Sequence, residues 1–524
     1  MIYRRNLFSV VPALLSLLFL STSCGRGEGC KSGGYSHLYE GLEFEMPVVD
    51  VPQIPSREVS LVDFGGVGDG VTLNTDAFAK AIAHLSEEGG GRLVVPSGIW
   101  FTGPVELKSS IDLHLTENAV ILFSPDRALY PIIETDFEGL PTRRCESPIH
   151  AENAANVAIT GLGTIDGNGA YWRPLKKSKV VSSQWKQQIS KGGYVGEDEV
   201  WYPDESYLIG MNLSDKNLNV PRGEFSDAQW EEMKSFLRPV MISFRNCENV
   251  FLEGVTFPNS PFWNIHPLLC RNVVIDGIKV RNPSYSQNGD GIDIDACENV
   301  ILVNSSFDVG DDGICIKSGK DAPGRDRGIP CRNLLIDNCV VFHGHGGFVV
   351  GSEMSGGVEN IKVSNCRFLG TDVGLRFKSK RGRGGIVRNI YIDNMYMTDI
   401  ATETILFDLF YGGVSAVEAA EAKANGKSEQ PVQMEEVPAV DETTPQFRDI
   451  YISNVVCNGA ARAMYFNGLP EMPVENINIS NCVISSVRGI EINRSKDVTL
   501  KNVKVHPSKG ESVAVNNVEN FRNE

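Results

Sequence analysis

Acidic side chains stand close together in the middle of this 524-residue chain, and their spacing suits the hydrolysis of glycosidic bonds. Three carboxylates lie in two short glycine-containing phrases, Asn288-Gly289-Asp290-Gly291 and Gly310-Asp311-Asp312-Gly313. In glycoside hydrolysis one carboxylic acid protonates the leaving oxygen, while another carboxylate activates water or attacks the sugar directly. Crowding of like charges raises the pKa of at least one such group, as an acid working at neutral pH requires.

An imidazole and two cations follow the carboxylates along the chain. They lie in Gly344-His345-Gly346 and in Leu375-Arg376-Phe377-Lys378. His345 is placed to tune the proton of the acid, and Arg376 and Lys378 share one face of a strand by the period of two. A guanidinium fork matches a carboxylate and an ammonium adds a point charge, so these residue types favour a uronic acid over a neutral glycan.

A sequence repeat predicts the elements that position these residues. Each copy is an Asn or Asp followed by alternating apolar residues, and the steps from 249 to 389 are 23, 27, 34, 27 and 29 residues. Such steps are typical of stacked units, and without helical stretches between the strands they indicate a parallel β-solenoid. The repeated Asn suits a left-handed turn. The copies begin at Asn156, Asn249, Asn272, Asn299, Asn333, Asn360, Asn389, Asp449, Asn476 and Asp497.

Successive coils of a solenoid stack at the strand spacing of about 4.8 Å. The four phrases that carry the polar residues are about one coil apart. We therefore expect the three carboxylates, the imidazole and the two cations to line one face of the solenoid within roughly 15 Å.

The repeat and its gaps divide the chain. We expect a signal peptide at 1–23, a tether and N-terminal extension at 24–57, an N-terminal cap with the first coils at 58–130, and a parallel β-helix catalytic domain at 131–520. This domain would carry two insertions: an ordered loop at 171–238, and one at 413–446 whose low apolar content indicates mobility. In the cap, Asn74-Thr75-Asp76 and Gly89-Gly90-Gly91 bracket a predicted helix with Phe78, Ile82 and Leu85 on one face.

The N-terminus has the pattern of an export signal. Arg4 and Arg5 precede an apolar run from Leu7 to Leu20, which is too short for a comfortable bilayer span. Small residues then lead to Cys24, as in a bacterial lipoprotein signal, although Leu20 sits one place earlier than that pattern usually has it. We expect lipidation of Cys24 and a place in the periplasm or on the outer membrane or cell surface of a bacterium; simple secretion is the alternative.

Composition restricts the partners further. The formal charge of −17 gives no overall field that would attract nucleic acid. Seven of the twelve cysteines stand at one of two set positions in the repeat: four come two residues before the repeated Asn, and three come six residues after it. This placement predicts stacked, buried free thiols rather than disulfides. These seven are Cys247, Cys270, Cys297, Cys331, Cys339, Cys366 and Cys482.

Each candidate residue also has an ordinary structural explanation. Any single Asp-Gly pair is more often a turn, and the Asp311-Asp312 pair alone suggests a cation site. The basic residues from Arg376 to Arg383 would alone fit a solvated rim. The recurrence of polar residues at one place in successive coils favours the catalytic interpretation.

At these residues the sequence resembles the polygalacturonases, the pectin-degrading hydrolases of glycoside hydrolase family 28. The family's Asn-Thr-Asp, Gly-Asp-Asp, Gly-His-Gly and Arg-Ile-Lys motifs appear in order, with Gly289 in place of Thr and Phe377 in place of Ile. The phrase Gly351-Ser352-Glu353-Met354-Ser355-Gly356-Gly357 looks like the bacterial branch of the family. The resemblance runs from about Val62 to the last coils.

The resemblance implies a right-handed parallel β-helix that hydrolyses α-1,4-linked galacturonate with inversion at the anomeric carbon. With the helix predicted near the N-terminus, the expected fold is all-β with a short N-terminal α/β cap. Inversion requires carboxyl groups about 6.5 to 9.5 Å apart. The resemblance implies no cofactor and no metal. It makes Asp311 the general acid, Asp290 and Asp312 the holders of the attacking water and His345 the support of the acid. Asn288, Arg376, Lys378 and Tyr411 would bind the substrate.

Other activities remain open from the sequence. The insertion at 171–238 favours release of units from chain ends, yet a rhamnogalacturonan backbone fits the same motifs. A pectate lyase would use a basic residue with calcium, and a non-catalytic β-helix would bind pectin through Arg376 and Lys378 alone.

Overall fold

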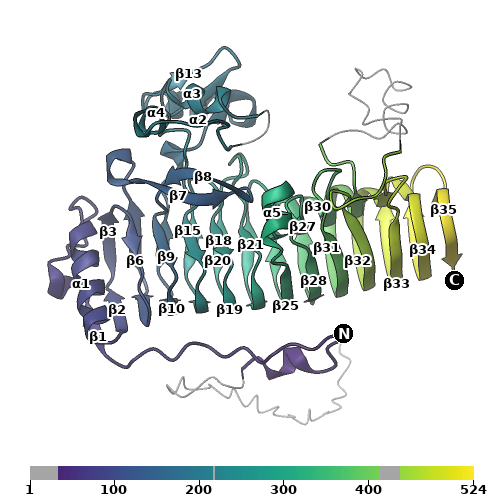
Figure 1. Cartoon of the computed structure of the whole chain (residues 1–524), viewed down its shortest axis with the longest axis horizontal. Coiled ribbons are helices and arrows are strands. Elements are labelled where there is room, and N and C mark those ends of the chain that lie inside the picture. The colour runs from purple at the N-terminus through teal and green to yellow at the C-terminus, as the bar shows by residue number, and fades with distance from the viewer. Residues whose placement is uncertain (1–33, 216–218, 413–436) are drawn as a thin grey trace, which may run out of the picture.

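The computed structural model describes residues 34–215, 219–412 and 437–524. The predicted signal peptide and Cys24 lie outside these ranges, as do residues 413–436 of the second insertion. The remainder is one long solenoid whose strands stack in parallel from the N-terminal to the C-terminal end (Figure 1). The expected right-handed parallel β-helix is confirmed.

Each complete coil contributes three short strands, and each strand pairs in parallel with its counterpart in the next coil. The sheet that carries the polar phrases consists of β4 (Val105–Glu106), β9 (Ile149–Glu152), β15 (Ile242–Arg245), β18 (Ile265–Leu268), β21 (Ile292–Asp295), β24 (Ile314–Lys317), β27 (Gly344–Val350) and β30 (Thr371–Lys378). The second sheet consists of β1 (Glu58–Ser60), β2 (Gly91–Val95), β5 (Ile111–Leu115), β10 (Ala155–Gly161), β16 (Glu248–Glu253), β19 (Arg271–Asp276), β22 (Glu298–Val303), β25 (Cys331–Asp337) and β28 (Val358–Ser364).

The third sheet consists of β3 (Gly98–Thr102), β6 (Ala119–Phe123), β11 (Thr164–Asp166), β17 (Thr256–Pro258), β20 (Lys279–Arg281), β23 (Ser306–Asp308), β26 (Val340–Val341) and β29 (Arg367–Leu369). Toward the C-terminus the strands run on into one another around each coil. They become β31 (Ile386–Asp408), β32 (Gln446–Asn467), β33 (Val474–Ser486), β34 (Arg488–Pro507) and β35 (Val513–Asn523).

The repeated Asn forms a ladder of side-chain hydrogen bonds between coils. Asn299 donates to Asn272 at 3.1 Å and accepts from Asn333 at 3.0 Å, and the same bond recurs from Asn156 to Asn389. All ten repeat residues have a φ between 52° and 59°, the left-handed region that Asn tolerates better than most residues. The ladder therefore fixes one turn of each coil and sets the stacking register.

The interior is filled by the inward-facing apolar residues of the three sheets. The ten cysteines of the described residues are buried and free, and Cys270 lies between Cys247 and Cys297 in the stack. This confirms the expectation for the seven cysteines that follow the repeat. Buried free thiols here act as small apolar groups that fill the corner of each coil.

Helix α1 (Thr75–Glu87) covers the N-terminal end of the solenoid, as predicted. Phe78, Ile82 and Leu85 are buried in the main core. Asn74 is the N-cap residue, but its side chain does not cap the helix. Instead it bonds the backbone of Val67 and Phe101, so it ties the helix entrance to the first coil.

The insertion at 171–238 is more than an ordered loop. It contains α2 (Ser182–Ile189), α3 (Tyr207–Asn212), α4 (Asp227–Glu232) and a small sheet of β12 (Leu175–Lys176), β13 (Tyr194–Val195) and β14 (Val200–Tyr202). A separate apolar cluster that includes Trp172, Tyr207 and Phe236 packs α3, α4, β13 and β14 together. Strand periodicity is absent from the sequence of this segment because its elements are short and pack through aromatic rings from distant positions.

The antiparallel hairpin of β7 (Ile132–Phe137) and β8 (Leu140–Cys145) lies between this insertion and the solenoid (Figure 1). Its Arg144 is almost fully buried and donates to the carbonyl oxygens of Asn219 and Arg238. The guanidinium also lies 3.9 Å from the ring centre of Phe137. The hairpin therefore anchors the insertion on the solenoid.

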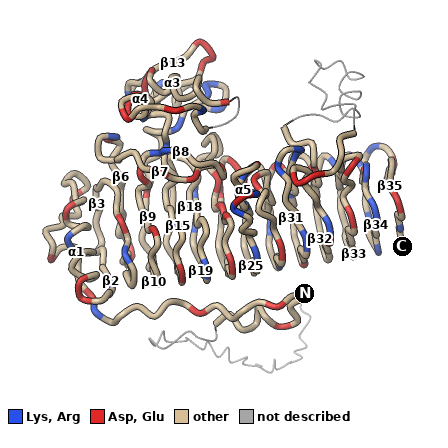
Figure 2. The backbone as a smooth tube through the Cα atoms, viewed as in Figure 1, with Lys and Arg blue, Asp and Glu red and all other residues tan. Residues whose placement is uncertain are grey.

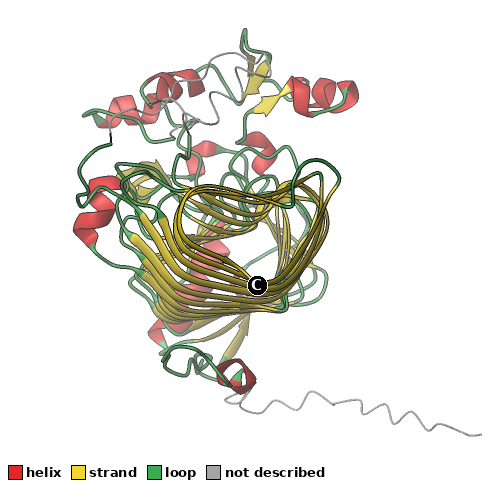
Figure 3. Ribbon diagram, turned by 90° about the vertical axis from the view of Figure 1, so that its right-hand side faces the viewer, coloured by secondary structure: helices red, strands yellow, loops and turns green. Residues whose placement is uncertain are grey.

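Residues 35–54 form an extended strap along the outside of the second sheet. The strap begins with a short 3-10 helix (Ser36–Tyr39) and covers outward-facing apolar residues of successive coils, among them Phe251, Val274 and Ile301. Tyr35 donates to Asp276 at 3.0 Å, and Phe44 stacks on Tyr391. The strap lies on the side of the solenoid opposite to the insertion (Figures 1 and 3). Among the helices of the described residues, none is long and apolar enough to cross a membrane.

Candidate active site

The three predicted carboxylates meet at the turns before β21 and β24. Strand β21 pairs with β24 so that Ile292 faces Ile314, and this register puts Asp290 beside Asp312 in the next coil. One oxygen of each of Asp290, Asp311 and Asp312 lies within 4.8 Å of the others. This is closer than the separation expected for inversion, because the side chains converge on one point instead of diverging across a groove.

Asp312 is held ionised by two cations from β30. Lys378 Nζ lies 2.7 Å from Oδ2, and Arg376 lies 3.3 Å from Oδ1. Burial of Asp312 disfavours the charge, yet Lys378 and Arg376 outweigh it and hold the pKa of Asp312 at about 2. Arg376 and Lys378 therefore point to the same carboxylate, as their spacing on one strand face predicts.

Asp290 has the opposite environment. It is 4% exposed, and its Oδ1 has no hydrogen-bond partner among the described residues. Burial, together with the nearby carboxylates of Asp311 and Asp293, raises the pKa of Asp290 well above its usual range. The protein environment alone therefore favours a proton on Asp290 and a charge on Asp312.

Asp311 is the most accessible of the three carboxylates and contacts the predicted imidazole. Its Oδ1 lies 3.2 Å from Nδ1 of His345 and accepts the backbone N–H of Asp312 at 3.0 Å. The hydrogen bond to Asp311 raises the pKa of His345, although burial opposes the shift. His345 is thus placed to hold a proton in direct contact with Asp311.

Asn288 and Tyr411 complete the predicted set. Asn288 accepts a hydrogen bond from Arg238, a residue of the insertion, at 3.4 Å. The ring of Tyr411 lies 5.0 Å from the ammonium of Lys378 and 5.7 Å from the guanidinium of Arg376. The structure therefore brings together all eight residues predicted for catalysis and substrate binding, and Cys24 lies outside the described residues.

Two open cavities meet above these residues. One has a volume of about 680 Å³ and is lined on its far side by Lys317, Lys320, Lys380 and Arg383. The other has a volume of about 600 Å³ and extends under the insertion, against Lys176, Tyr202 and Phe236. Asn288, Asp311, Lys378 and Tyr411 line both cavities. Together the cavities form a groove over the carboxylates, and the insertion walls one part of it.

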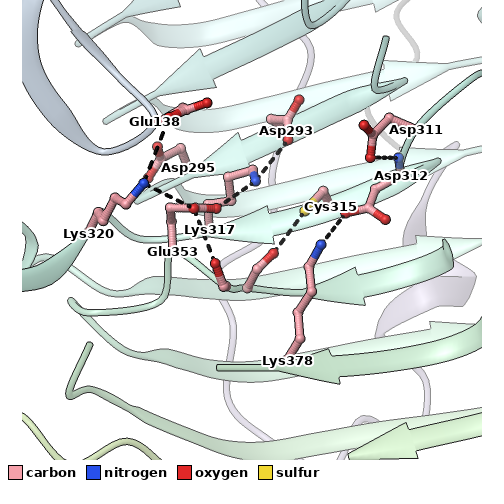
Figure 4. A network of polar contacts seen from close by, with 12 residues as sticks. Glu138, Asp293, Asp295, Asp311, Asp312, Cys315, Lys317, Lys320, Glu353 and Lys378 are labelled. Atoms are coloured by element: carbon pink, nitrogen blue, oxygen red, sulfur yellow. Dashed lines mark hydrogen bonds and ion pairs between the residues drawn. The ribbon is translucent and has the colours of Figure 1, made fainter. Parts of the chain in front are cut away.

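A buried network beside the carboxylates could not be predicted from the motifs (Figure 4). Lys317 lies 2.9 Å from Glu353 and 3.5 Å from Asp293, and Lys320 lies 3.7 Å from Glu138. Burial raises the pKa of Asp293 to about 8, although Lys317 opposes the shift. Asp293 and Lys317 alternate with buried Ile residues directly after the catalytic turns, and this alternation was the available sequence signal.

The carboxylates form an all-oxygen set of the kind that hard divalent cations prefer. However, both oxygens of Asp312 already face Lys378 and Arg376. The arrangement is therefore better matched to proton transfer and to binding of an anion than to holding a metal ion.

Comparison with known proteins agrees with this geometry. Residues 223–447 match the profile of the glycosyl hydrolases family 28. A probable polygalacturonase of Vitis vinifera is 33% identical over 404 residues, which are 74% of this chain and 69% of that protein. An exo-poly-alpha-D-galacturonosidase of Dickeya chrysanthemi is 29% identical over 68% of this chain and 57% of that protein.

Solved structures show the same fold. A hyperthermoactive exopolygalacturonase from Thermotoga maritima superimposes with a TM-score of 0.70 at 32% identity, over 88% of this chain and 95% of that one. A family 28 exopolygalacturonase from Yersinia enterocolitica superimposes with a TM-score of 0.68 at 24% identity, over 89% of this chain and 78% of that one. By its motifs, its fold and these matches, the chain belongs to glycosyl hydrolases family 28.

Proposed function

We propose that this protein is an exo-acting polygalacturonase, which hydrolyses the α-1,4-galacturonosyl linkages of pectin, the acidic polysaccharide of plant cell walls. The observation that carries the proposal is the convergence of Asp290, Asp311 and Asp312 in a groove whose cations, Arg376 and Lys378, come from the neighbouring strand. The relatives named polygalacturonase and exo-poly-alpha-D-galacturonosidase support the substrate.

Asp311 is the proposed general acid because it is the most accessible of the three carboxylates and has His345 as its partner. Asp290 and Asp312 hold the attacking water. The protein environment alone favours a proton on Asp290, and an oxygen of Asp290 lies within 4.8 Å of one of Asp311, so the acid would draw its proton from this group of carboxylates. Arg376 and Lys378, with Asn288 and Tyr411, bind the sugar and its carboxylate.

The proposed exo action rests on the insertion at 171–238, which walls part of the groove through Lys176, Tyr202 and Phe236. We also propose that residues 131–520 form the catalytic domain, as expected from the sequence. The proposed inversion rests on the family resemblance alone. The carboxylate oxygens approach within 4.8 Å of one another, which is closer than the separation of about 6.5 to 9.5 Å typical of inverting enzymes. The anomer released first, observed by proton NMR, tests the stereochemistry.

The deciding experiment is incubation of the purified protein with de-esterified polygalacturonate in a chelator. Reducing ends, ultraviolet absorbance and the size of the products are followed, with Asp311→Asn as the control. New reducing ends without absorbance, lost in the variant, support a hydrolase, and early release of monomer or dimer supports exo action. A parallel reaction without chelator covers the lyase alternative: ultraviolet-absorbing products there, and none with chelator, would instead indicate a lyase.

Absence of reducing ends would overturn the proposed activity on galacturonan. Rhamnogalacturonan fragments would then be tested as substrates. The wild type could also bind galacturonate without hydrolysing it, with the same affinity in Asp311→Asn. The protein would then only bind pectin, through Arg376 and Lys378.

We also propose that the protein is exported and carries a lipid on Cys24, in the periplasm or at the outer surface of a bacterium. The support is the sequence pattern of the first 24 residues. Labelling of cells with a radioactive fatty acid tests the anchor: label in the wild type and none in Cys24→Ser is the expected result. Export with no label in either protein would indicate simple secretion.

A further inference from the structure

The cavity on the far side of the carboxylates has a basic wall that the proposed catalytic roles do not use. This basic wall consists of Lys320, Lys380 and Arg383, which all line the cavity. Lys320 and Arg383 are each at most 4% exposed. Lys380 follows Lys378 by two residues, just beyond the end of β30.

Two members of the basic wall have acidic partners of their own. Lys320 lies 3.7 Å from Glu138 and 3.8 Å from Glu353, and Arg383 pairs with Asp321. Glu353 is shared, because it also contacts Lys317 at 2.9 Å and Arg383 at 3.9 Å. One carboxylate thus serves three cations.

Lys380 differs from its neighbours. Within the part of the chain that the structure describes, its ammonium makes neither an ion pair nor a hydrogen bond. The side chain is half-buried, and partial burial, followed by the positive charge of Arg383, lowers the pKa of Lys380. An anion placed in the cavity would relieve this repulsion.

The charges around the cavity also favour an anion. Besides the predicted catalytic and substrate-binding residues, the charged residues that line the cavity are the cations Arg222, Lys317, Lys320, Lys380, Arg381 and Arg383 and the carboxylates Glu138, Asp215, Asp321 and Glu353. Six cations therefore face four carboxylates in this part of the cavity. A local positive field therefore exists in a chain of net charge −17, with acidic and basic positions close together around α5 (Asp321–Arg327; Figure 2).

We propose that Lys380, supported by Lys320 and Arg383, binds a second carboxylate of the substrate, so that the enzyme selects a run of consecutive uronates. The inference rests on the proposed function. Arg376 and Lys378 hold one uronate beside Asp312, and the basic wall faces another sugar of the same chain through the shared cavity. A backbone in which uronate alternates with a neutral sugar would leave Lys380 without a partner.

The test compares Lys380→Gln with the wild type on trigalacturonate. Because Lys380 does not contact the reacting carboxylates, the variant should raise KM about tenfold with little change in kcat. Lys380→Arg keeps the charge and should restore most of the affinity. Lys504→Gln, at an exposed position on β34, is the matched control and should behave like the wild type.

A second substrate separates carboxylate recognition from general damage. On trigalacturonate methyl ester, which lacks the negative charges, the KM of Lys380→Gln should equal that of the wild type. An unchanged KM for trigalacturonate in Lys380→Gln, or an equal rise in KM on both substrates, would overturn the inference while leaving the hydrolase intact.

Failure of the proposed function is distinguishable, because the wild type would then release no reducing ends. Equilibrium binding of trigalacturonate by calorimetry would still decide the role of Lys380. Binding about tenfold weaker in Lys380→Gln than in the wild type supports the second carboxylate site, whereas equal binding or no binding overturns it.

Discussion

The ammonium nitrogen of Lys378 lies 2.7 Å from Oδ2 of Asp312, and both side chains are buried. The pair joins two coils through the same surface that would receive the sugar. One contact thus positions both the cation proposed to bind the substrate and the carboxylate proposed to hold the attacking water.

Replacement of Lys378 by Met should therefore affect both binding and the ionisation of Asp312. Without the ammonium, the pKa of Asp312 rises from about 2, so activity should be lost at a higher pH on the acid side. We expect kcat/KM to fall at least about a hundredfold, which corresponds to about 3 kcal/mol. Initial rates from pH 3 to pH 7 measure both effects.

Lys378→Arg is the control, since it keeps the positive charge. In Lys378→Arg, activity should be lost at the same acidic pH as in the wild type, even if the kcat/KM falls. An acid limb at the same pH in Lys378→Met and the wild type would contradict the assigned role of the pair.

The His345–Asp311 contact predicts the alkaline limb of the pH profile. The pKa of His345 is raised, so the imidazolium persists above pH 6.5 and is lost as the pH rises further. We expect the kcat/KM of the wild type to decline as the pH rises through the pKa of His345. His345→Gln should have a kcat/KM lower by about tenfold to a hundredfold at the outset. Its decline with pH should be weaker, because it lacks the imidazolium. His343→Gln is the matched control, because His343 pairs with Asp308 on the exposed rim. A decline of the same steepness in His345→Gln would show that another group causes it.

Asp293 predicts an unusual dependence of stability on pH. Its pKa is about 8 in the folded protein, whereas an unfolded Asp titrates near 4. Between these values the folded state binds more protons than the unfolded state, so this group lowers the free energy of unfolding as the pH rises. The change in the free energy of unfolding caused by Asp293→Asn should be more favourable at pH 8 than at pH 5 by about 4 kcal/mol, as measured by urea denaturation. An equal effect of the substitution at both pH values would argue against a proton on Asp293.

The Asn ladder predicts a difference between two substitutions at one position. Asn299→Ala removes a hydrogen bond on each side and puts Ala at a φ of 59°. We expect a loss of about 3 kcal/mol in the free energy of unfolding. Asn299→Gly also loses the bonds but tolerates the backbone, so it should lose less by about 1 kcal/mol. Equal losses would mean that the turn conformation contributes nothing at this coil.

The strap predicts a stability effect without a catalytic one. A chain that begins at residue 56 would expose the outward-facing Val274, Ile301 and Leu335 to water. The melting temperature should fall by several degrees, and light scattering should detect association through the uncovered stripe. The kcat/KM should stay unchanged, because the strap packs on the second sheet, whereas the groove lies over the turns that lead into strands of the first sheet. An unchanged melting temperature would contradict the stabilising role.

The repeat made much of this molecule predictable. An Asn that recurs with each coil fixes the strand register, and the register brings Asp290 beside Asp312 and Arg376 within reach of Asp312. The helix at Thr75–Glu87 followed from its apolar spacing and terminal glycines.

Features that depend on contacts outside the repeat were not predicted. The pairing of Lys317 with Glu353 joins positions 36 residues apart and needs the exact turn geometry of both coils. The insertion folds around rings such as Tyr130 and Trp172, which the repeat does not relate. Outward-facing Phe251 and Val274 indicated a covered outer face, but the covering segment precedes the repeat and carries none of its pattern.

The path of the strap also determines how the molecule is presented to its surroundings. Tyr35 donates to Asp276 at the end of β19, a strand of the second sheet, and the strap lies on the side of the solenoid turned away from the insertion (Figures 1 and 3). Any attachment made through the N-terminal end would therefore leave from the back of the enzyme. The mouth of the groove would then face outward, free to meet a polymer too large to reach between the enzyme and the surface that carries it.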